Sequence, residues 1–375
     1  MKRPENGTTR APDAANKVKA EASVSRQAKK TPKLPPPDKS HFDNRQLSLF
    51  QTFLCNTDEE EDHLSNAIDL WDSVPRYSVS RQAMTKSRIN GRFLEEHEAT
   101  FQHRGRTYTR TIHPALVADL DGKKRYFYPS DTEELVEHAL RKLAIEQQAG
   151  YFDKPNYRSG VVFTLYALRE EMQKRGHTRS YQQLVQALDI LSHAIIDIAP
   201  HAEGEAKMVS PYLPSLVVVS RAKLREDPKA KWAVQFHPLV TGSIDKVTYR
   251  QFNYHLMVSH STQLARWLHQ QLVIKYTFAN HHAPFEMRYS TVKRDSGLLD
   301  FYGRDRDAVV ALQEAFTEIK ERQVILGYDR KDVTGPRKKL VDVVFTIQPS
   351  VDFIRATKAA NKRQSAAQGN APSSR

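Results

Sequence analysis

The chain has 375 residues, of which 39% are hydrophobic and 27% charged, and its formal net charge is +13. This length suits two domains of ordinary size. No apolar run approaches the roughly 18 residues that span a bilayer, and the first residues lack the apolar stretch of a secretory signal. The single cysteine, Cys55, excludes an internal disulfide and a multi-cysteine zinc site. We therefore expect a cytoplasmic protein without a membrane partner.

The positive charge is concentrated at the two ends of the chain. Residues 1–45 carry 11 Lys/Arg against 5 Asp/Glu, a net charge of +6, and residues 355–375 carry 5 Lys/Arg and no acid, a net charge of +5. Both segments are polar and poor in large apolar residues, so we predict disordered basic tails over 1–45 and 354–375. Basic tails attract polyanions, most often nucleic acid, although they can also serve only solubility.

A linker predicted over 46–65 begins with an apolar string that has no core of its own. The string is Gln46-Leu47-Ser48-Leu49-Phe50, and it lies between a Pro-rich run at 33–38 and an acidic cluster at 58–62. One amide with a Leu and a Leu-Phe pair can fill adjacent apolar pockets on another protein. The alternative is an ordinary half-buried strand, since short alternation of this kind is common.

A first domain is predicted over 66–240. Alternating residues predict short strands over 92–128, and Ser130 and Asp131 offer the cap of a helix that reaches about Gln148. A helix is then expected over 165–172, followed by a turn over 174–179. A longer helix from Ser180 is expected to carry apolar residues at spacings of three and four, namely Leu184, Leu188, Leu191, Ile195 and Ile198. Strands over 215–220 and 232–237 flank a basic loop at 221–231.

A second domain, predicted over 241–353, repeats that order. A long helix is expected over about 259–280, a short extended segment over 285–289, and a turn over 293–297. Asp305 is expected to cap a helix with buried Val309, Leu312, Phe316 and Ile319. Strands over 324–328 and 340–347 then form a hairpin whose tip carries basic residues, namely Arg330, Lys331, Arg337, Lys338 and Lys339. Helix, turn, helix and hairpin is the order of a winged helix-turn-helix. The predicted class is therefore α+β, with two such domains in tandem.

The order of these motifs resembles the TrfA-type plasmid replication initiators. The resemblance covers roughly 44–350 and rests on the Gln46–Phe50 string, which is similar to the peptide that binds the polymerase sliding clamp, on the lead-in Trp71–Pro75, and on the helix pair around 163–166 and 179–181. It implies binding to direct repeats (iterons) at an origin, opening of nearby A·T-rich DNA and recruitment of the clamp, the host replicative helicase and a host origin-binding protein. It also implies inactive homodimers, repression of the chain's own promoter and a nucleoid- or plasmid-associated location.

Candidate DNA contacts lie at the starts of the two expected reading helices and on the second hairpin. A helix N-terminus enters the major groove first, where Gln can pair with adenine and Arg with guanine. In the first domain the candidates are Arg179, Tyr181, Gln182 and Gln183; in the second they are Lys293, Arg294, Arg304 and Arg306 with the five basic hairpin residues. Packing of the helices or a solvated charged face would explain the same residues, and Asp305 and Asp307 disfavour nearby phosphate.

The sequence gives no pattern of an enzyme. There is no phosphate-binding Gly-x-x-x-x-Gly-Lys-Ser/Thr loop, and the pairs His281-His282 and His255/His260 lack the His-x-His spacing of metal-dependent nicking enzymes. We expect neither a cofactor nor a metal. A winged-helix repressor is the main alternative, which the clamp-like peptide disfavours, and a nucleoid-binding protein with little sequence preference is a third. The sequence leaves open whether the active form is a monomer or a dimer.

Overall fold

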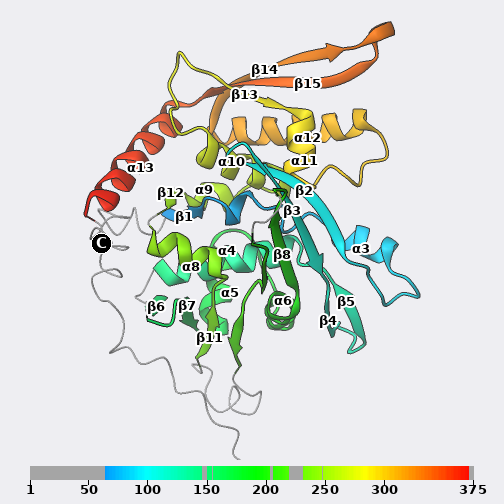
Figure 1. The fold of residues 1–375 in the computed structure, drawn as a ribbon, viewed down its shortest axis with the longest axis vertical. Helices are drawn as coiled ribbons and strands as arrows, with labels where there is room; N and C mark the ends of the chain where they lie inside the picture. The colour runs from blue at the N-terminus through cyan, green and yellow to red at the C-terminus, as the bar shows by residue number, and fades with distance from the viewer. Residues whose placement is uncertain are drawn as a thin grey trace, which may run out of the picture. The chain divides into compact units, whose positions relative to one another are not determined.

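The computed structural model describes residues 64–145, 150–153, 155–202, 206–218, 231–246 and 248–370. The Gln46–Phe50 string, Cys55 and most of the basic loop at 221–231 lie outside these residues. Within the described part, no helix is both long and apolar enough to cross a membrane. Figure 1 shows the mixed arrangement of helices and antiparallel strands, which agrees with the predicted α+β class.

The first half of the chain builds three helices on a four-stranded antiparallel sheet. Thr164 accepts a hydrogen bond from the Ala167 amide and starts one helix, and Ser180 forms a capping box with Gln183 at the start of the next. The helices are α4 (Asp131–Ile145), α5 (Leu165–Lys174) and α6 (Tyr181–His193), and the strands, in sheet order, are β10 (Ser215–Val217), β11 (Trp232–Gln235), β7 (Arg158–Phe163) and β6 (Gly150–Asp153). These helices begin at Asp131, Leu165 and Tyr181, each within one residue of its predicted start.

Helix α6 ends earlier than predicted. Ala194 is already extended, with ψ 131°, and the following residues form strand β8 (Ile195–Pro200). Ile196 and Ile198 pair with Ile112 and Arg110 of β3, so the β-branched run is buried by a strand partner that the helical spacing could not reveal. The prediction that Ile195 and Ile198 continue the helix is wrong.

A second sheet and a hairpin flank α6. The strand prediction over 92–128 is confirmed, and the four-stranded sheet has the order β2-β3-β8-β9. Its bounds are β2 (His97–His103), β3 (Arg106–His113), β8 and β9 (Met208–Pro211), and the hairpin is formed by β4 (Ala115–Ala118) and β5 (Lys124–Phe127), next to α3 (Arg81–Ser87). The hairpin lies against α6, because the Gln186 amide donates to the Ala118 carbonyl at 3.2 Å.

The second half of the chain builds the same kinds of element in the same order. Its elements are α10 (Gln263–Lys275), β13 (Phe285–Arg288), α11 (Tyr289–Ser296), α12 (Asp305–Glu321), β14 (Ile325–Thr334) and β15 (Leu340–Pro349). Their sheet order is β13-β15-β14, and the corresponding strands of the first half run β7-β11-β10. In both halves, therefore, the strand before the helix pair contacts the last strand, which in turn contacts the first strand of the hairpin.

Three predictions in this half are corrected. The helix expected over 259–280 is shorter: α9 (Tyr254–Val258) precedes it, and Thr262 caps α10. The turn expected over 293–297 is helix α11, which ends where Gly297 adopts a left-handed φ of 63° that suits glycine. Asp305 is the first residue of α12 rather than its cap, because its side chain is occupied by other partners.

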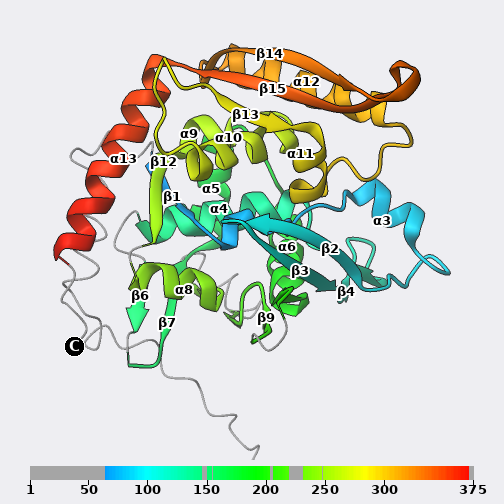
Figure 2. The same cartoon turned by 45° about the horizontal axis from the view of Figure 1, so that its top comes forward.

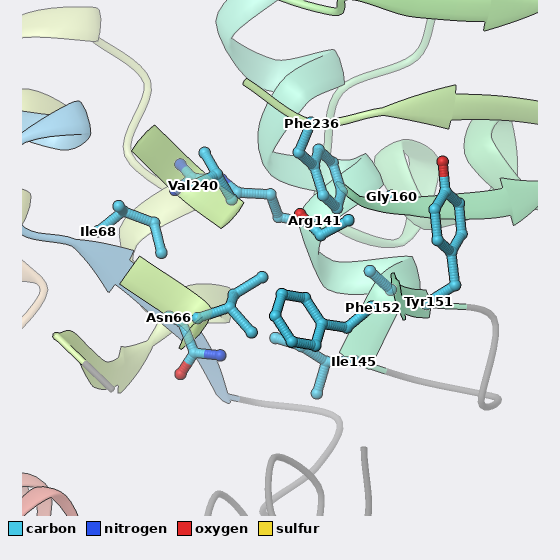
Figure 3. A pocket seen from close by; sticks show the side chains of 13 residues that line it. Asn66, Ile68, Arg141, Ile145, Tyr151, Phe152, Gly160, Phe236 and Val240 are labelled. Carbon is cyan, nitrogen blue, oxygen red and sulfur yellow. The ribbon is translucent and has the colours of Figure 1, made fainter. Parts of the chain in front are cut away.

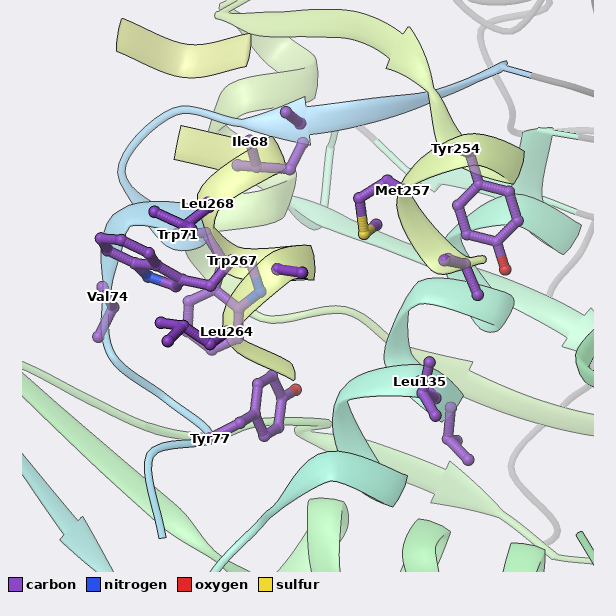
Figure 4. Close-up of a cluster of buried hydrophobic side chains, with 14 of the residues drawn as sticks. Ile68, Trp71, Val74, Tyr77, Leu135, Tyr254, Met257, Leu264, Trp267 and Leu268 are labelled. Carbon is purple, nitrogen blue, oxygen red and sulfur yellow. The ribbon is translucent and has the colours of Figure 1, made fainter. Parts of the chain in front are cut away.

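The two halves share one hydrophobic core. Strand β1 (Leu64–Ile68) pairs with β12 (Tyr249–Asn253), and the short helix Trp71–Ser73 follows it. Figure 4 shows Trp71, Val74 and Tyr77 beside Trp267 of α10. Side-chain amides of α10 fix this segment, since Gln263 donates to the Tyr77 carbonyl at 2.9 Å and Gln271 to the Asp72 carbonyl at 3.2 Å.

A buried charge network lies beneath the same segment. The guanidinium of Arg141 donates to both carboxylate oxygens of Asp72 at 2.8 and 2.9 Å, and Arg76 bridges Asp72 and Glu137 at 2.7 and 2.6 Å. Glu137 also accepts from the Trp71 indole at 2.6 Å. Two arginines thus balance two acids, which is the condition for burying such charges.

The basic C-terminal segment is helical where disorder was predicted from residue 354. Helix α13 covers Val351–Asn370, and Phe353, Ile354 and Ala360 are buried. The helix contacts β12, whose Arg250 donates to Asn361 at 2.7 Å and to Gln364 at 3.2 Å. This apolar stripe is short and interrupted by charges, so its burial depends on a distant strand.

Candidate nucleic-acid interface

Helix α12 has one buried and one exposed face. Val309, Leu312 and Phe316 point into the core, where the Phe316 ring lies 4.7 Å from that of Phe345 on β15. The helical period therefore turns Arg306 and Val310 outward, and both are exposed. A helix with a free polar face is the element that fits the major groove of duplex DNA.

The start of α12 is organised by an ion pair. Lys293 of α11 donates to the Asp305 carboxylate at 2.8 Å, and the Tyr289 hydroxyl donates to the same oxygen at 2.8 Å. The hydrogen bond from Lys293 lowers the pKa of Asp305, and the same bond raises the pKa of Lys293. The negative charge of Asp305 is therefore compensated within the protein, which leaves Arg304 and Arg306 as the exposed cations beside it.

The strands of the second hairpin are longer than predicted, so Arg330 and Lys331 lie on β14 and not in the tip. Arg330 donates to both oxygens of Asp332, at 2.7 and 3.1 Å, and to the Gln313 side chain of α12 at 2.8 Å. Lys331 follows on the strand and is exposed. The sequence could not show that one of the two neighbouring cations is paired internally.

The tip of the hairpin is level with the start of α12. Because β14 runs back along α12, the Arg330–Gln313 bond fixes their relative position. From Gln313 to Asp305 the helix extends about 12 Å, and from Arg330 to Thr334 the strand extends about 13 Å. A short 3-10 turn at Pro336–Lys338 closes the hairpin, with Arg337 and Lys339 exposed. Figures 1 and 2 show the hairpin following α12 to this end.

Arg294 is held away from this group. It donates to Asp295 at 2.8 Å, and the same carboxylate also accepts from the Gln102 amide at 3.0 Å and from Lys275 at 3.3 Å. Asp295 is buried, so Arg294 contributes to the contact between α11 and β2. Of the four cations predicted around the start of α12, the structure gathers Lys293, Arg304 and Arg306 there.

In the first half, Arg179 is partly committed to the fold before α6 starts. Its guanidinium donates to Thr132 at 3.3 Å and to the Thr178 carbonyl at 3.0 Å, and it lies 3.6 Å from Asp131. Asp131 also accepts from Arg266 of α10. The predicted contact residue is thus connected through one carboxylate to the second half of the chain.

The other candidates at the start of α6 are Tyr181, Gln182 and Gln183, and their side chains differ in how freely they can contact DNA. The Gln183 side-chain oxygen accepts from the Ser180 amide at 2.9 Å, so a two-pronged bond from Gln183 to adenine requires opening of the capping box. The Tyr181 ring is covered on one face by Arg169, at 4.9 Å, and remains exposed. Gln182 is exposed. Tyr181 and Gln182 are therefore the freer pair.

The surface around α12 also includes residues that were not among the predicted DNA contacts. Arg288 ends β13 with an exposed side chain, and Val310, Gln313 and Thr317 continue the outer face of α12. The signal for the helix residues was present, because the buried positions 309, 312, 316 and 319 leave these positions outward. Among the described residues, no group of three or more His, Cys, Asp or Glu side chains could hold a metal ion.

Comparisons with known proteins give likenesses to solved structures only. No protein-family model and no curated protein matches the chain. Domains 2 and 3 of RctB, in a selenomethionine derivative, align with a TM-score of 0.48 and 11% identity over 76% of this chain and 99% of that chain. The Pi initiator protein in complex with iteron DNA aligns with a TM-score of 0.32 and 12% identity over 78% of this chain and 99% of that chain. At these values the likenesses carry no argument about function.

Proposed function

We propose that the chain is a replication initiator that binds directly repeated duplex DNA through two winged helix-turn-helix units. The observation that supports this most is the arrangement at the start of α12: an exposed helix face with Arg304 and Arg306, level with a hairpin tip that carries Arg337 and Lys339. In this arrangement α12 enters a major groove, and the hairpin contacts the phosphates beside it.

The first unit supplies a second contact of the same kind. Helix α6 begins with exposed Tyr181 and Gln182, and the basic loop at 221–231 occupies the place of its hairpin tip in the chain order. Two reading helices joined by a common core suit two successive grooves of one repeat. Strain imposed on the bound DNA promotes opening of a neighbouring A·T-rich segment.

The Gln46–Phe50 string favours an initiator over a repressor built on the same units. It binds the polymerase sliding clamp, so that origin opening is linked to polymerase loading, and the host helicase and origin-binding protein join the same assembly. A repressor has no use for a clamp. The proposed clamp binding is supported by the sequence, because residues 46–50 lie outside the described part of the chain.

Nuclease footprinting on the DNA that flanks the gene, at physiological salt, tests the proposal. We expect protection that recurs at a fixed spacing of about two helical turns beside an A·T-rich segment. A single protected palindrome over the promoter would instead assign the chain as a repressor. Diffuse protection that disappears as salt is raised would leave only non-specific binding by the basic tails.

A further inference from the structure

A partly open pocket with a cavity volume of about 50 Å³ lies between β1, α4, the β6–β7 strands and α8 (Pro238–Asp245). Its wall is almost entirely apolar; Figure 3 shows Ile68, Ile145, Phe152 and Val240 around it. None of the candidate DNA contacts lines this pocket. A partly open apolar hollow of this kind can accept an apolar side chain of a peptide, although it is smaller than a typical small-molecule site.

One polar side chain in the wall has no partner. Both carboxamide atoms of Asn66 are buried without a hydrogen bond among the described residues, and Asn66 is only 4% exposed. Leaving such atoms unpaired costs about 1–3 kcal/mol. The other polar side chains of the wall have partners. Arg141 donates to Asp72, Ser159 is hydrogen-bonded to Thr241, and the Tyr151 hydroxyl donates to the Val234 carbonyl. An occupant that completes the pocket thus needs apolar side chains together with an amide or backbone group for Asn66.

The chain's own N-terminal segment meets these requirements. Asn66 and Ile68 belong to β1, and β1 begins at Leu64, where the described residues begin. Thirteen residues separate Phe50 from Leu64, and they span at most about 45 Å when extended. The segment 46–54 (Gln-Leu-Ser-Leu-Phe-Gln-Thr-Phe-Leu) is the densest apolar stretch ahead of β1 and carries backbone amides and two glutamines.

We infer that this pocket holds the chain's own segment 46–54, with Phe50 inserted among the apolar side chains and a peptide group on Asn66. The inference rests on the proposed function, because it assigns a resting place to the same residues that bind the clamp. Docked in this way, Leu49 and Phe50 are covered. The segment must therefore leave the pocket before the clamp can bind it. A short tether gives the pocket an effective concentration of the segment in the millimolar range.

Disulfide trapping in the full-length chain tests the docking without the clamp. Cys55 is the only cysteine, so a Cys55→Ser background carries only the introduced pair Phe50→Cys and Ile244→Cys. Leu34→Cys with Ile244→Cys is the matched control, since chain length alone makes that pair roughly threefold slower. With diamide as the oxidant, we expect the Phe50 pair to form at least 30-fold faster. A ratio near threefold would overturn the inference.

A pocket-filling variant gives the second test. Ile244→Trp occupies the space that Phe50 requires, and we expect the full-length variant to bind the clamp at least fivefold more tightly while duplex binding, which reports folding, is unchanged. Unchanged clamp affinity with intact duplex binding would refute the mutual exclusion. If a synthetic 44–54 peptide does not bind the clamp at all, the proposed clamp role fails, and the trapping ratio still decides the docking.

Discussion

Arg330 holds Asp332 in a two-pronged ion pair, with Nε and Nη2 lying 2.7 and 3.1 Å from the two carboxylate oxygens. The two residues project from the same face of β14, and Arg330 also donates to Gln313 of α12. The pair therefore joins the hairpin to the outer face of the expected reading helix. It also withholds a guanidinium from any phosphate that approaches the hairpin.

Replacing either partner of this ion pair breaks it, and the two replacements should change DNA affinity in opposite directions. In Asp332→Asn the guanidinium of Arg330 becomes free for phosphate, so we expect tighter duplex binding and a salt slope steeper by about 1. Arg330→Ala should weaken binding. Asp329→Asn is the control, since it removes a charge from the same strand and frees no arginine. Affinity titrations at several salt concentrations measure the slopes; equal slopes in all variants would place the hairpin outside the interface.

Removing the cations of the hairpin tip weakens binding without changing sequence preference. The triple variant Arg337→Ala, Lys338→Ala and Lys339→Ala should flatten the salt slope by up to about 2.7, because each phosphate that is no longer neutralised reduces the slope by about 0.9. Specific and non-specific DNA should lose affinity alike, because phosphate contacts carry no sequence information. The same titrations on both DNAs measure this. An unchanged slope would contradict contact between the tip and DNA.

The clamp-like string is separable from DNA binding. Replacing Leu49 and Phe50 with alanine removes both apolar anchors, and because such anchors are each worth about 2 kcal/mol or more, we expect clamp affinity to fall at least 30-fold. Duplex affinity should stay the same, as it should in the control Leu34→Ala. Surface plasmon resonance with immobilised clamp provides the measurement. An equal loss of duplex affinity would make the string a structural element of the DNA-binding region.

Glu134 makes stability depend on pH near neutrality. Burial raises its pKa to about 7, against the opposing effect of Arg266, whose guanidinium lies 3.3 Å away. The folded state holds the proton more tightly, so this contribution is complete below about pH 4.5 and is lost as pH rises to about 7, a change of roughly 3 kcal/mol. Glu134→Gln should therefore gain in stability relative to the unmodified chain over that range.

Urea unfolding between pH 4.5 and 8 measures this difference, with exposed Glu314→Gln as the control. The measured quantity is the difference in free energy of unfolding between the Glu134→Gln variant and the unmodified chain. A difference that does not vary with pH would contradict the raised pKa of Glu134. The control exchange removes a carboxylate from the outer face of α12 and should give a gap that is constant over the same range.

Stability should be sensitive to the buried pair of Asp72 and Arg141. Asp72→Asn leaves Arg76 and Arg141 with only Glu137 to balance them. One buried positive charge is then uncompensated, which typically costs about 3–5 kcal/mol. The exposed pair Asp352–Arg355 provides the control, because Asp352→Asn should cost less than about 0.5 kcal/mol. Denaturant midpoints compare the two. Similar small losses would show that the buried arginines find other partners.

Local sequence signals determined several elements of this protein. Thr164 and Ser180 mark the starts of α5 and α6 because their side chains satisfy free amides of the first turn. The spacing of Val309, Leu312 and Phe316 fixes which face of α12 is buried, and hence that Arg306 is exposed. These features depend on residues within one or two helical turns, so the sequence suffices to place them.

Only the tertiary structure decided where the strands form and which charges are free. Ile195 and Ile198 have helical spacing after α6, yet the partner strand β3, about 85 residues earlier, makes them part of a sheet. Arg306 remains exposed, whereas Arg294 is paired with Asp295, a residue that also binds Gln102 of β2. Strand pairing and ion pairing join positions far apart in the chain, and their energies depend on burial that no local pattern specifies.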